Sequence, residues 1–131
     1  MLSENKISSS LEDYLEAIYI LIRKHGYARV KEIAKLLNVK SSSVSEAILR
    51  LKSSGLVIHE RYGFIKLTDK GELLAKEIYR KHVKLLNFLV NVLGVPAEIA
   101  EKDACAIEHV ISKVTLNKLL EFVKKYTSTR S

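Results

Sequence analysis

The chain has 131 residues, of which 22 are basic and 15 acidic, so its formal net charge is +7, and 47% of its residues are hydrophobic. This size allows one compact domain or two small ones, and a single cysteine excludes an intramolecular disulfide. No apolar run approaches the about 20 residues that span a bilayer, and the N-terminus shows no secretory signal pattern. We therefore expect a cytoplasmic protein that does not enter membranes. Its basic excess favours a polyanionic partner as much as a merely solvated surface.

The first predicted helix covers about residues 10–24. Serines at positions 8–10 offer N-caps, and Leu11, Leu15 and Ile18 recur at helical spacing. Gly26 is expected to close the helix.

Two short helices joined by a tight turn are predicted next. Val30, Ile33 and Leu37 form the apolar face of the first of these helices, and residues 38–40 form the turn. Ser41 or Ser42 is expected to cap the second helix, and the residues of that helix that face inward are Val44, Ile48 and Leu51. This arrangement, with Gly55 in the left-handed conformation after it, is typical of a helix-turn-helix.

A β-hairpin is predicted directly after the helix-turn-helix. The apolar pattern changes to a period of two from Val57 to Arg61 and resumes at Ile65 and Leu67, with Gly63 in the turn. A helix-turn-helix followed at once by a hairpin indicates a winged helix, and we assign residues 1–71 to this DNA-binding domain.

Three further helices are predicted in residues 72–131. Thr68 would cap a helix that runs to about residue 93, Pro96 would lie in the first turn of the next helix, and Thr115 would cap the last one. A winged helix does not need these helices, so their apolar stripes indicate a second core and a dimer interface. The predicted fold is mainly α with one small β-hairpin: a winged helix-turn-helix followed by a helical dimerisation domain.

Candidate DNA-binding residues lie on the exposed face of the second helix of the motif and on the wing. Hydroxyls and backbone N–H groups at a helix N-terminus suit phosphate, Arg50 suits guanine or phosphate, and Glu46 could accept from a cytosine amino group. Each residue taken alone could equally be an ordinary surface residue. The candidates are Lys40, Ser41, Ser42, Ser43, Ser45, Glu46, Arg50, Lys52, Arg61 and Lys66.

Candidate metal ligands form a second constellation. Cys105, Glu108 and His109 lie at positions i, i+3 and i+4, on one face of a helix. A thiol, a carboxylate and an imidazole together suit a transition ion better than calcium or magnesium. Three ligands from one helix cannot close a coordination shell, so residues near the inward faces of other helices join the set: Asp13, Glu16 and His82. Taken singly, a buried cysteine or histidine is more often structural.

With these residues in place, the chain resembles the diphtheria toxin repressor family of metal-dependent transcriptional regulators, and within it the short manganese transport regulator branch. The stretches that carry the resemblance are SLEDYLEAIYIL, GYARVKEIAKLLNVKSSSVSEAILRLKSSGLV, KLTDKGELLAKEIYRKH and DACAIEHVIS, and it extends over about residues 8–126. The resemblance implies a homodimeric repressor, not an enzyme, that binds a palindromic operator in double-stranded DNA and controls genes of metal homeostasis. It also implies that residues 72–131 bind metal and that the six candidates match ligand positions.

The resemblance leaves the identity of the metal open. Asp13 and Glu16 are similar to the carboxylates of the manganese branch, whereas Cys105 is similar to the iron-responsive branch. We expect Mn²⁺ or Fe²⁺, with Co²⁺ and Zn²⁺ as further candidates. Leu86 replaces a carboxylate that the iron branch uses in an ancillary site, although Glu101 could contribute there.

Two other functions stay open at this point. One is a winged-helix regulator that senses no metal. The other is a metallohydrolase, which would need an open coordination position with a general base beside it.

Overall fold

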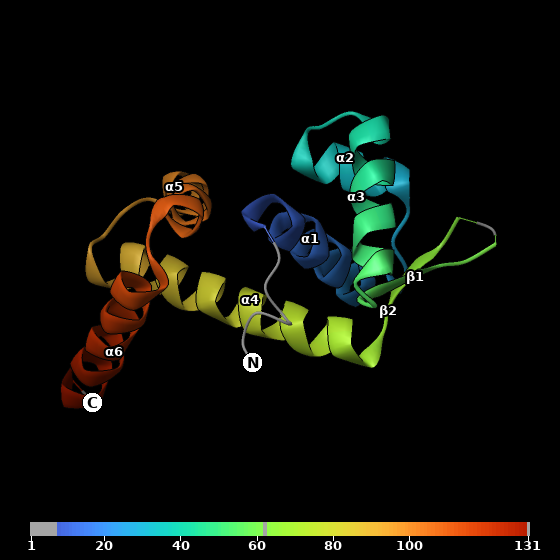
Figure 1. The fold of residues 1–131 in the computed structure, drawn as a ribbon. Helices are drawn as coiled ribbons and strands as arrows, with labels where there is room; N and C mark the ends of the chain where they lie inside the picture. Colours follow the sequence, from blue (N-terminus) through green and yellow to red (C-terminus); the bar gives the residue numbers. More distant parts are fainter. Residues whose placement is uncertain (1–7, 62, 131) are drawn as a thin grey trace. The chain divides into compact units, whose positions relative to one another are not determined.

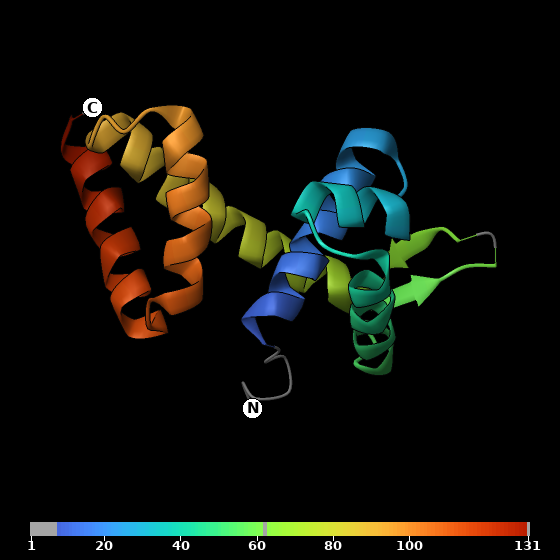
Figure 2. The same ribbon diagram turned by 90° about the horizontal axis from the view of Figure 1, so that it is seen from above.

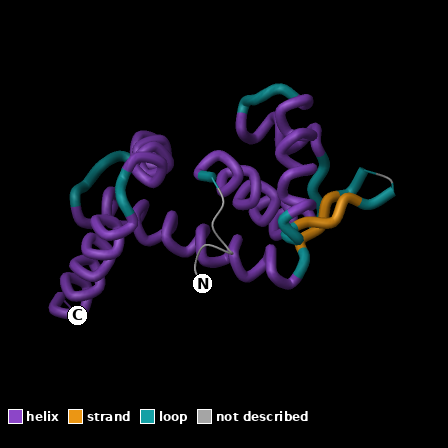
Figure 3. The backbone as a smooth tube through the Cα atoms, in the orientation of Figure 1, coloured by secondary structure: helices purple, strands orange, loops and turns teal. Residues whose placement is uncertain are grey.

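The computed structural model describes residues 8–61 and 63–130, and the side chains of Ser9, His109 and residues 127–130 lie outside that description. The chain forms two compact units, Met1–Ile78 and Tyr79–Ser131. Its helices and one two-stranded sheet confirm the predicted fold class (Figures 1 and 3). The domain ranges 1–71 and 72–131 stay a prediction. None of the helices in the described ranges combines the length and apolar character needed to cross a bilayer.

Helix α1 (Ser9–His25) is capped as the sequence predicts. The N–H of Leu11 donates to the hydroxyl oxygen of Ser8 at 3.2 Å. At the other end, Gly26 takes a φ of 85° and donates its N–H to the carbonyl of Ile22 at 2.7 Å. Leu15 and Ile18 are fully buried in the core of the N-terminal unit.

Helices α2 (Val30–Leu37) and α3 (Ser41–Ser53) form the predicted helix-turn-helix. Asn38 makes the turn in the left-handed conformation, with a φ of 57°. The predicted serine cap of α3 is wrong. Lys40 occupies the N-cap position, and its carbonyl accepts from the N–H groups of Ser43 and Val44 at 3.0 and 3.2 Å. Because the left-handed turn is complete at Asn38, Ser41 is already helical and its hydroxyl faces solvent.

Strands β1 (Val57–His59) and β2 (Ile65–Leu67) pair antiparallel and form the predicted wing, with Val57 opposite Leu67. Gly63 has a φ of 87°, as a turn of this kind requires.

The base of the wing is attached to the segment before α2. The N–H of Ile65 donates to the carbonyl of Ala28 at 2.8 Å. The ring of Tyr27 packs edge-on against Phe64, and the guanidinium of Arg29 lies 4.4 Å from the centre of the Phe64 ring. These contacts fix the wing to the rest of the N-terminal unit.

Helix α4 (Asp69–Asn87) begins with the predicted Thr68 cap. The hydroxyl of Thr68 accepts from the N–H of Gly71 at 3.0 Å and donates to the carbonyl of Gly55 at 2.6 Å. A Cβ atom at Gly71 would overlap the carbonyl group of Leu56. Glycine therefore lets the first turn of α4 approach the backbone that leads into β1.

The C-terminal unit contains the end of α4, a π-helical turn η2 (Phe88–Val92), α5 (Ala97–Val110) and α6 (Lys113–Arg130) (Figure 2). Its core is built from Leu85, Leu89, Ala100, Ala104 and Leu116. These helices thus have the second core that the sequence predicts.

Two expected helix starts shift in this unit. Pro96 takes the N-cap position of α5 instead of lying in its first turn. The predicted cap at Thr115 is wrong, because α6 already starts at Lys113 and the hydroxyl of Ser112 accepts from the N–H of Thr115 at 3.1 Å. The extended backbone at Ile111, with a ψ of 142°, ends the previous helix early enough for Ser112 to act as the cap.

Candidate DNA interface and metal centre

The exposed face of α3 carries most of the predicted DNA-binding residues. The helix buries Val44, Ala47, Ile48 and Leu51, so its other side faces solvent. All predicted positions on and before this helix are exposed: Lys40, Ser41, Ser42, Ser43, Ser45, Glu46, Arg50 and Lys52. Basic residues lie before the first turn and in the last turn of the helix, at Lys40, Arg50 and Lys52.

The N-terminal end of α3 is suited to an anion. The first N–H groups of a helix have no partner within the helix, and the helix dipole places partial positive charge there. The first turn of α3 contains no acidic residue. The hydroxyls of Ser41 and Ser42 add donors at the same end, so a phosphate group is the ligand that this end fits.

The wing adds two exposed basic residues, Arg61 and Lys66. The ammonium of Lys66 lies 3.4 Å from a carboxylate oxygen of Glu60, with the two side chains 60% and 42% exposed. An ion pair this exposed contributes only about 0–1 kcal/mol, so a DNA phosphate can take the place of Glu60.

Leu49 and Arg29 are not among the residues that the sequence predicts for DNA binding. Leu49 is an exposed leucine on the polar face of α3. The helical period alone would have placed it there. Arg29 supports the wing through its contact with Phe64. That contact joins the segment before α2 to the hairpin and has no local sequence signal.

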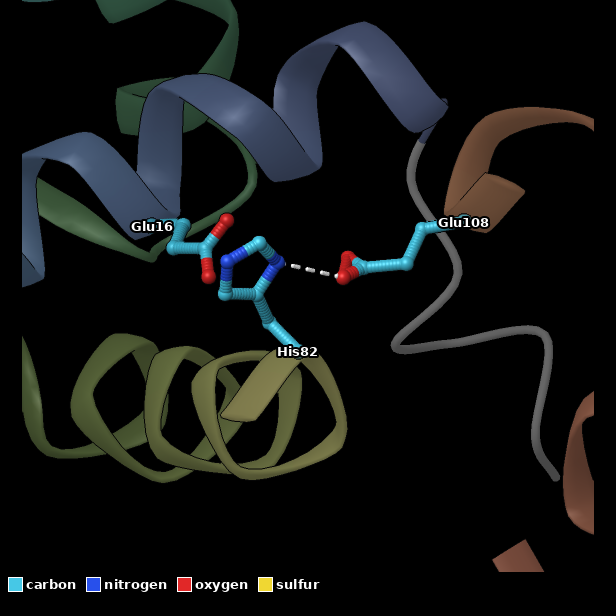
Figure 4. A group of neighbouring side chains, drawn as sticks. All are labelled: Glu16, His82 and Glu108. Carbon is cyan, nitrogen blue, oxygen red and sulfur yellow. Dashed lines mark hydrogen bonds and ion pairs between the residues drawn. The ribbon is translucent and has the colours of Figure 1, made fainter. Parts of the chain in front are cut away.

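The C-terminal unit brings together an imidazole and two carboxylates. Nδ1 of His82, on α4, lies 2.7 Å from Oε2 of Glu108, on α5 (Figure 4). Nε2 of the same ring lies 3.2 Å from Oε1 of Glu101, two turns earlier on α5. His82 and Glu108 are two of the six predicted ligands, whereas Glu101 was expected only near an ancillary site.

Burial separates the two carboxylates. The side chains of His82 and Glu108 are 13% and 18% exposed, whereas Glu101 is 58% exposed. Two ligands of one ion with bonds of about 2.1 Å lie roughly 3 Å apart when they are neighbours in the shell. The His82–Glu108 pair has this spacing, and imidazole with carboxylate suits Mn²⁺, Fe²⁺ and Zn²⁺. The residues present therefore fit a divalent transition ion.

Cys105 is exposed on α5, so the prediction that it lies near an inward face is wrong. The buried stripe of α5 follows Ala100 and Ala104, and the next residue points away from it. The side chain of His109 lies outside the described part of the chain. The metal-binding roles of Cys105 and His109 stay predictions.

The two remaining candidates, Asp13 and Glu16, lie one turn apart on α1, and both are half-buried. Their role as ligands also stays a prediction. Leu86 packs against the core of the C-terminal unit. An apolar side chain thus takes the position at which the iron branch has a carboxylate.

Both parts of the chain match a family model. Residues 6–65 match the N-terminal DNA-binding domain of iron dependent repressors, and residues 68–129 match their metal-binding and dimerisation domain. The HTH-type transcriptional regulator MntR of Lysinibacillus sphaericus is 38% identical over 115 residues, which make up 88% of this chain and 82% of that protein.

Solved structures give the same relationship. IdeR of T. acidophilum has a TM-score of 0.73 at 33% identity, over 84% of this chain and 52% of IdeR. The manganese regulator SloR has a TM-score of 0.73 at 34% identity, over 87% of this chain and 53% of SloR. The chain thus spans about half the length of these two solved relatives. As its resemblance predicted, the chain belongs to the family of iron-dependent repressors, metal-dependent transcriptional regulators with a DNA-binding domain and a metal-binding and dimerisation domain.

Proposed function

We propose that this protein is a metal-activated repressor of metal homeostasis genes that binds DNA as a homodimer. The observation that carries the proposal is the close pair of donors, His82 and Glu108, in the unit that matches a metal-binding domain. The exposed, serine-rich α3 in the unit that matches a DNA-binding domain supplies the second half of the function.

The proposed ligand set starts from His82 and Glu108. Asp13 and Glu16 would add two carboxylate oxygens from α1, and Cys105 and His109 would complete the set from α5. Carboxylates favour Mn²⁺, whereas a thiolate shifts the preference towards Fe²⁺, Co²⁺ or Zn²⁺. Whether Cys105 binds therefore decides the metal preference. A Cys105→Glu variant that keeps the wild-type order of metal affinities in a titration would exclude Cys105 from the set.

Metal binding is coupled to DNA binding through the placement of the ligands in the chain. Asp13 and Glu16 belong to the same compact unit as α3, whereas His82 and Glu108 belong to the other unit. An ion held by both groups would favour the arrangement of recognition helices that fits the operator. The ion must bind this DNA-competent state more tightly than other states, and DNA must then tighten metal binding by the same factor.

A homodimer is supported by apolar side chains that the C-terminal unit exposes. Residues 68–129 match a metal-binding and dimerisation domain, so a second copy of the chain is the partner that would cover them. The exposed side chains are Leu93, Ile99, Val110, Val114 and Phe122. A twofold dimer presents two copies of α3, so its operator would be a palindrome with half-sites about one helical turn, or a multiple of it, apart.

The proposal assigns the bound metal to regulation in the cytoplasm and not to catalysis. The family match supports this, because the family members are transcriptional regulators. A metallohydrolase would need an open coordination position and a separate general base, whereas we assign the carboxylates and the imidazole to the ligand set.

The direct test is a gel-shift series with the full chain and candidate promoter DNA, first with chelator and then with Mn²⁺, Fe²⁺, Co²⁺ and Zn²⁺ in turn. We expect specific binding only with metal. Equal affinity with and without metal would contradict the proposal and favour a regulator that senses no metal. Metal analysis of the purified protein would then decide between these two readings.

A further inference from the structure

We propose that Leu49 reads a thymine, by packing against its 5-methyl group in the major groove. The inference rests on the proposed function, because it describes the DNA-bound protein. It assigns sequence specificity to an apolar residue on a face that otherwise presents hydroxyls and charges.

The position of Leu49 on α3 carries the inference. Successive residues of a helix are rotated by about 100°. With the buried side defined by Val44, Ala47, Ile48 and Leu51, the stripe opposite the core consists of Ser42, Glu46, Leu49 and Ser53. Leu49 is 64% exposed. It therefore points away from the core in the same direction as Ser42 and Glu46, two of the candidate DNA-binding residues.

An exposed leucine on a DNA-reading helix can make an apolar contact with a base. Single exposed leucines are common on protein surfaces and need no function. On a helix that enters the major groove, however, the groove offers one prominent apolar group to a leucine, the thymine methyl. Contact between the two removes apolar surface from water on both sides. A base pair without that methyl would leave Leu49 against polar base edges, so the contact discriminates.

The spacing from Glu46 predicts where the thymine lies. Glu46 and Leu49 are three residues apart, which is about 4.5 Å along the helix axis. Successive base pairs are about 3.4 Å apart. The two side chains would thus reach neighbouring base pairs, and a glutamate in the groove accepts from a cytosine amino group. We expect a cytosine and a thymine at adjacent positions in each half-site.

Replacing thymine by deoxyuridine removes the methyl group and nothing else. The preferred operator would first be selected from random double-stranded DNA with the full chain and Mn²⁺, and each thymine then replaced in turn. With the wild-type protein, each half-site should contain one thymine whose single replacement weakens binding about fourfold, as expected for one methyl group returned to water. With Leu49→Ala, the thymine and deoxyuridine operators should bind equally. Leu49→Met, which keeps an apolar side chain, should retain the discrimination.

A matched control is Leu36→Ala, which removes another exposed leucine of the same unit, from α2. This variant should discriminate between thymine and deoxyuridine as the wild type does. The inference is overturned if no deoxyuridine replacement weakens wild-type binding, or if Leu49→Ala still discriminates. If the selection from random DNA enriches no sequence, with or without metal, the proposed function and this inference are both overturned. Specific metal-dependent binding without a methyl effect would overturn the inference alone.

Discussion

The two units of this protein place their functional groups in opposite ways. In the N-terminal unit, one helix and one hairpin present exposed side chains from a short stretch of sequence, residues 40–66. In the C-terminal unit, the central contact joins half-buried residues 26 positions apart, His82 and Glu108. A surface built on one helix follows from its period, whereas a donor pair depends on how two helices pack. A change at the donor pair should therefore remove the metal dependence of DNA binding, whereas a change on the exposed face of α3 should leave metal binding in the absence of DNA intact.

The largest effect is expected for Glu108→Ala. The variant removes one of the two closest donors, and we expect metal-dependent operator affinity to fall by more than about 100-fold, beyond the effect of altering a supporting residue. Weak, metal-independent DNA binding by the N-terminal unit should remain. Gel shifts with and without Mn²⁺ measure both. Glu121→Ala, which removes an exposed carboxylate from α6, is the control and should behave as the wild type.

Gly71→Ala changes the N-terminal unit, whereas Glu108→Ala changes the C-terminal one. The added Cβ overlaps the carbonyl of Leu56, and overpacking of this kind costs about 1–3 kcal/mol. Thermal unfolding should show the loss, while Mn²⁺ affinity measured at low temperature should change little. The control is Lys70→Ala, at an exposed site of the same helix turn. If Gly71→Ala is as stable as this control, the close approach of α4 to the backbone of Leu56 does not require glycine.

An intermediate effect is expected for Arg50→Ala on the exposed face of α3. Loss of one DNA contact should weaken operator binding by about tenfold, near the lower end of the range for a base contact. Binding of Mn²⁺ without DNA should stay unchanged, because Arg50 belongs to the other unit. Competition with unrelated DNA decides the type of contact. A base contact changes the preference for the operator, and a phosphate contact weakens binding to both DNAs equally.

A smaller effect is expected for Glu101→Ala. Glu101 bonds to the second nitrogen of His82, and such partners orient a metal-binding imidazole. Because Glu101 is largely exposed, we expect only about a threefold loss of Mn²⁺ affinity in calorimetry. Asp103→Ala removes an equal charge from an exposed site on the same helix. An equal loss in both variants would point to general charge and not to the contact with His82.

The helices, the wing and the exposed face of α3 could be predicted because each follows from local periodicity and turn residues. Capping was less predictable. Both Ser112 and Thr115 can cap α6, and only the backbone angles of the preceding residue decide between them. The contact between His82 and Glu101 joins residues 19 positions apart, so it depends on the packing of α5 against α4. The exposure of Cys105 likewise follows from which stripe of α5 the core takes.

The ion pair on the wing has a consequence for the counterions of the operator. A lysine that binds a phosphate normally releases condensed cations, which lowers the slope of log affinity against log salt by about 0.9 per contact. Lys66 must first leave Glu60, and the carboxylate that it leaves attracts a cation in return. The salt dependence of operator binding should therefore be shallower than the number of basic contacts implies. A Glu60→Gln variant should make the salt dependence of operator binding steeper in a salt titration.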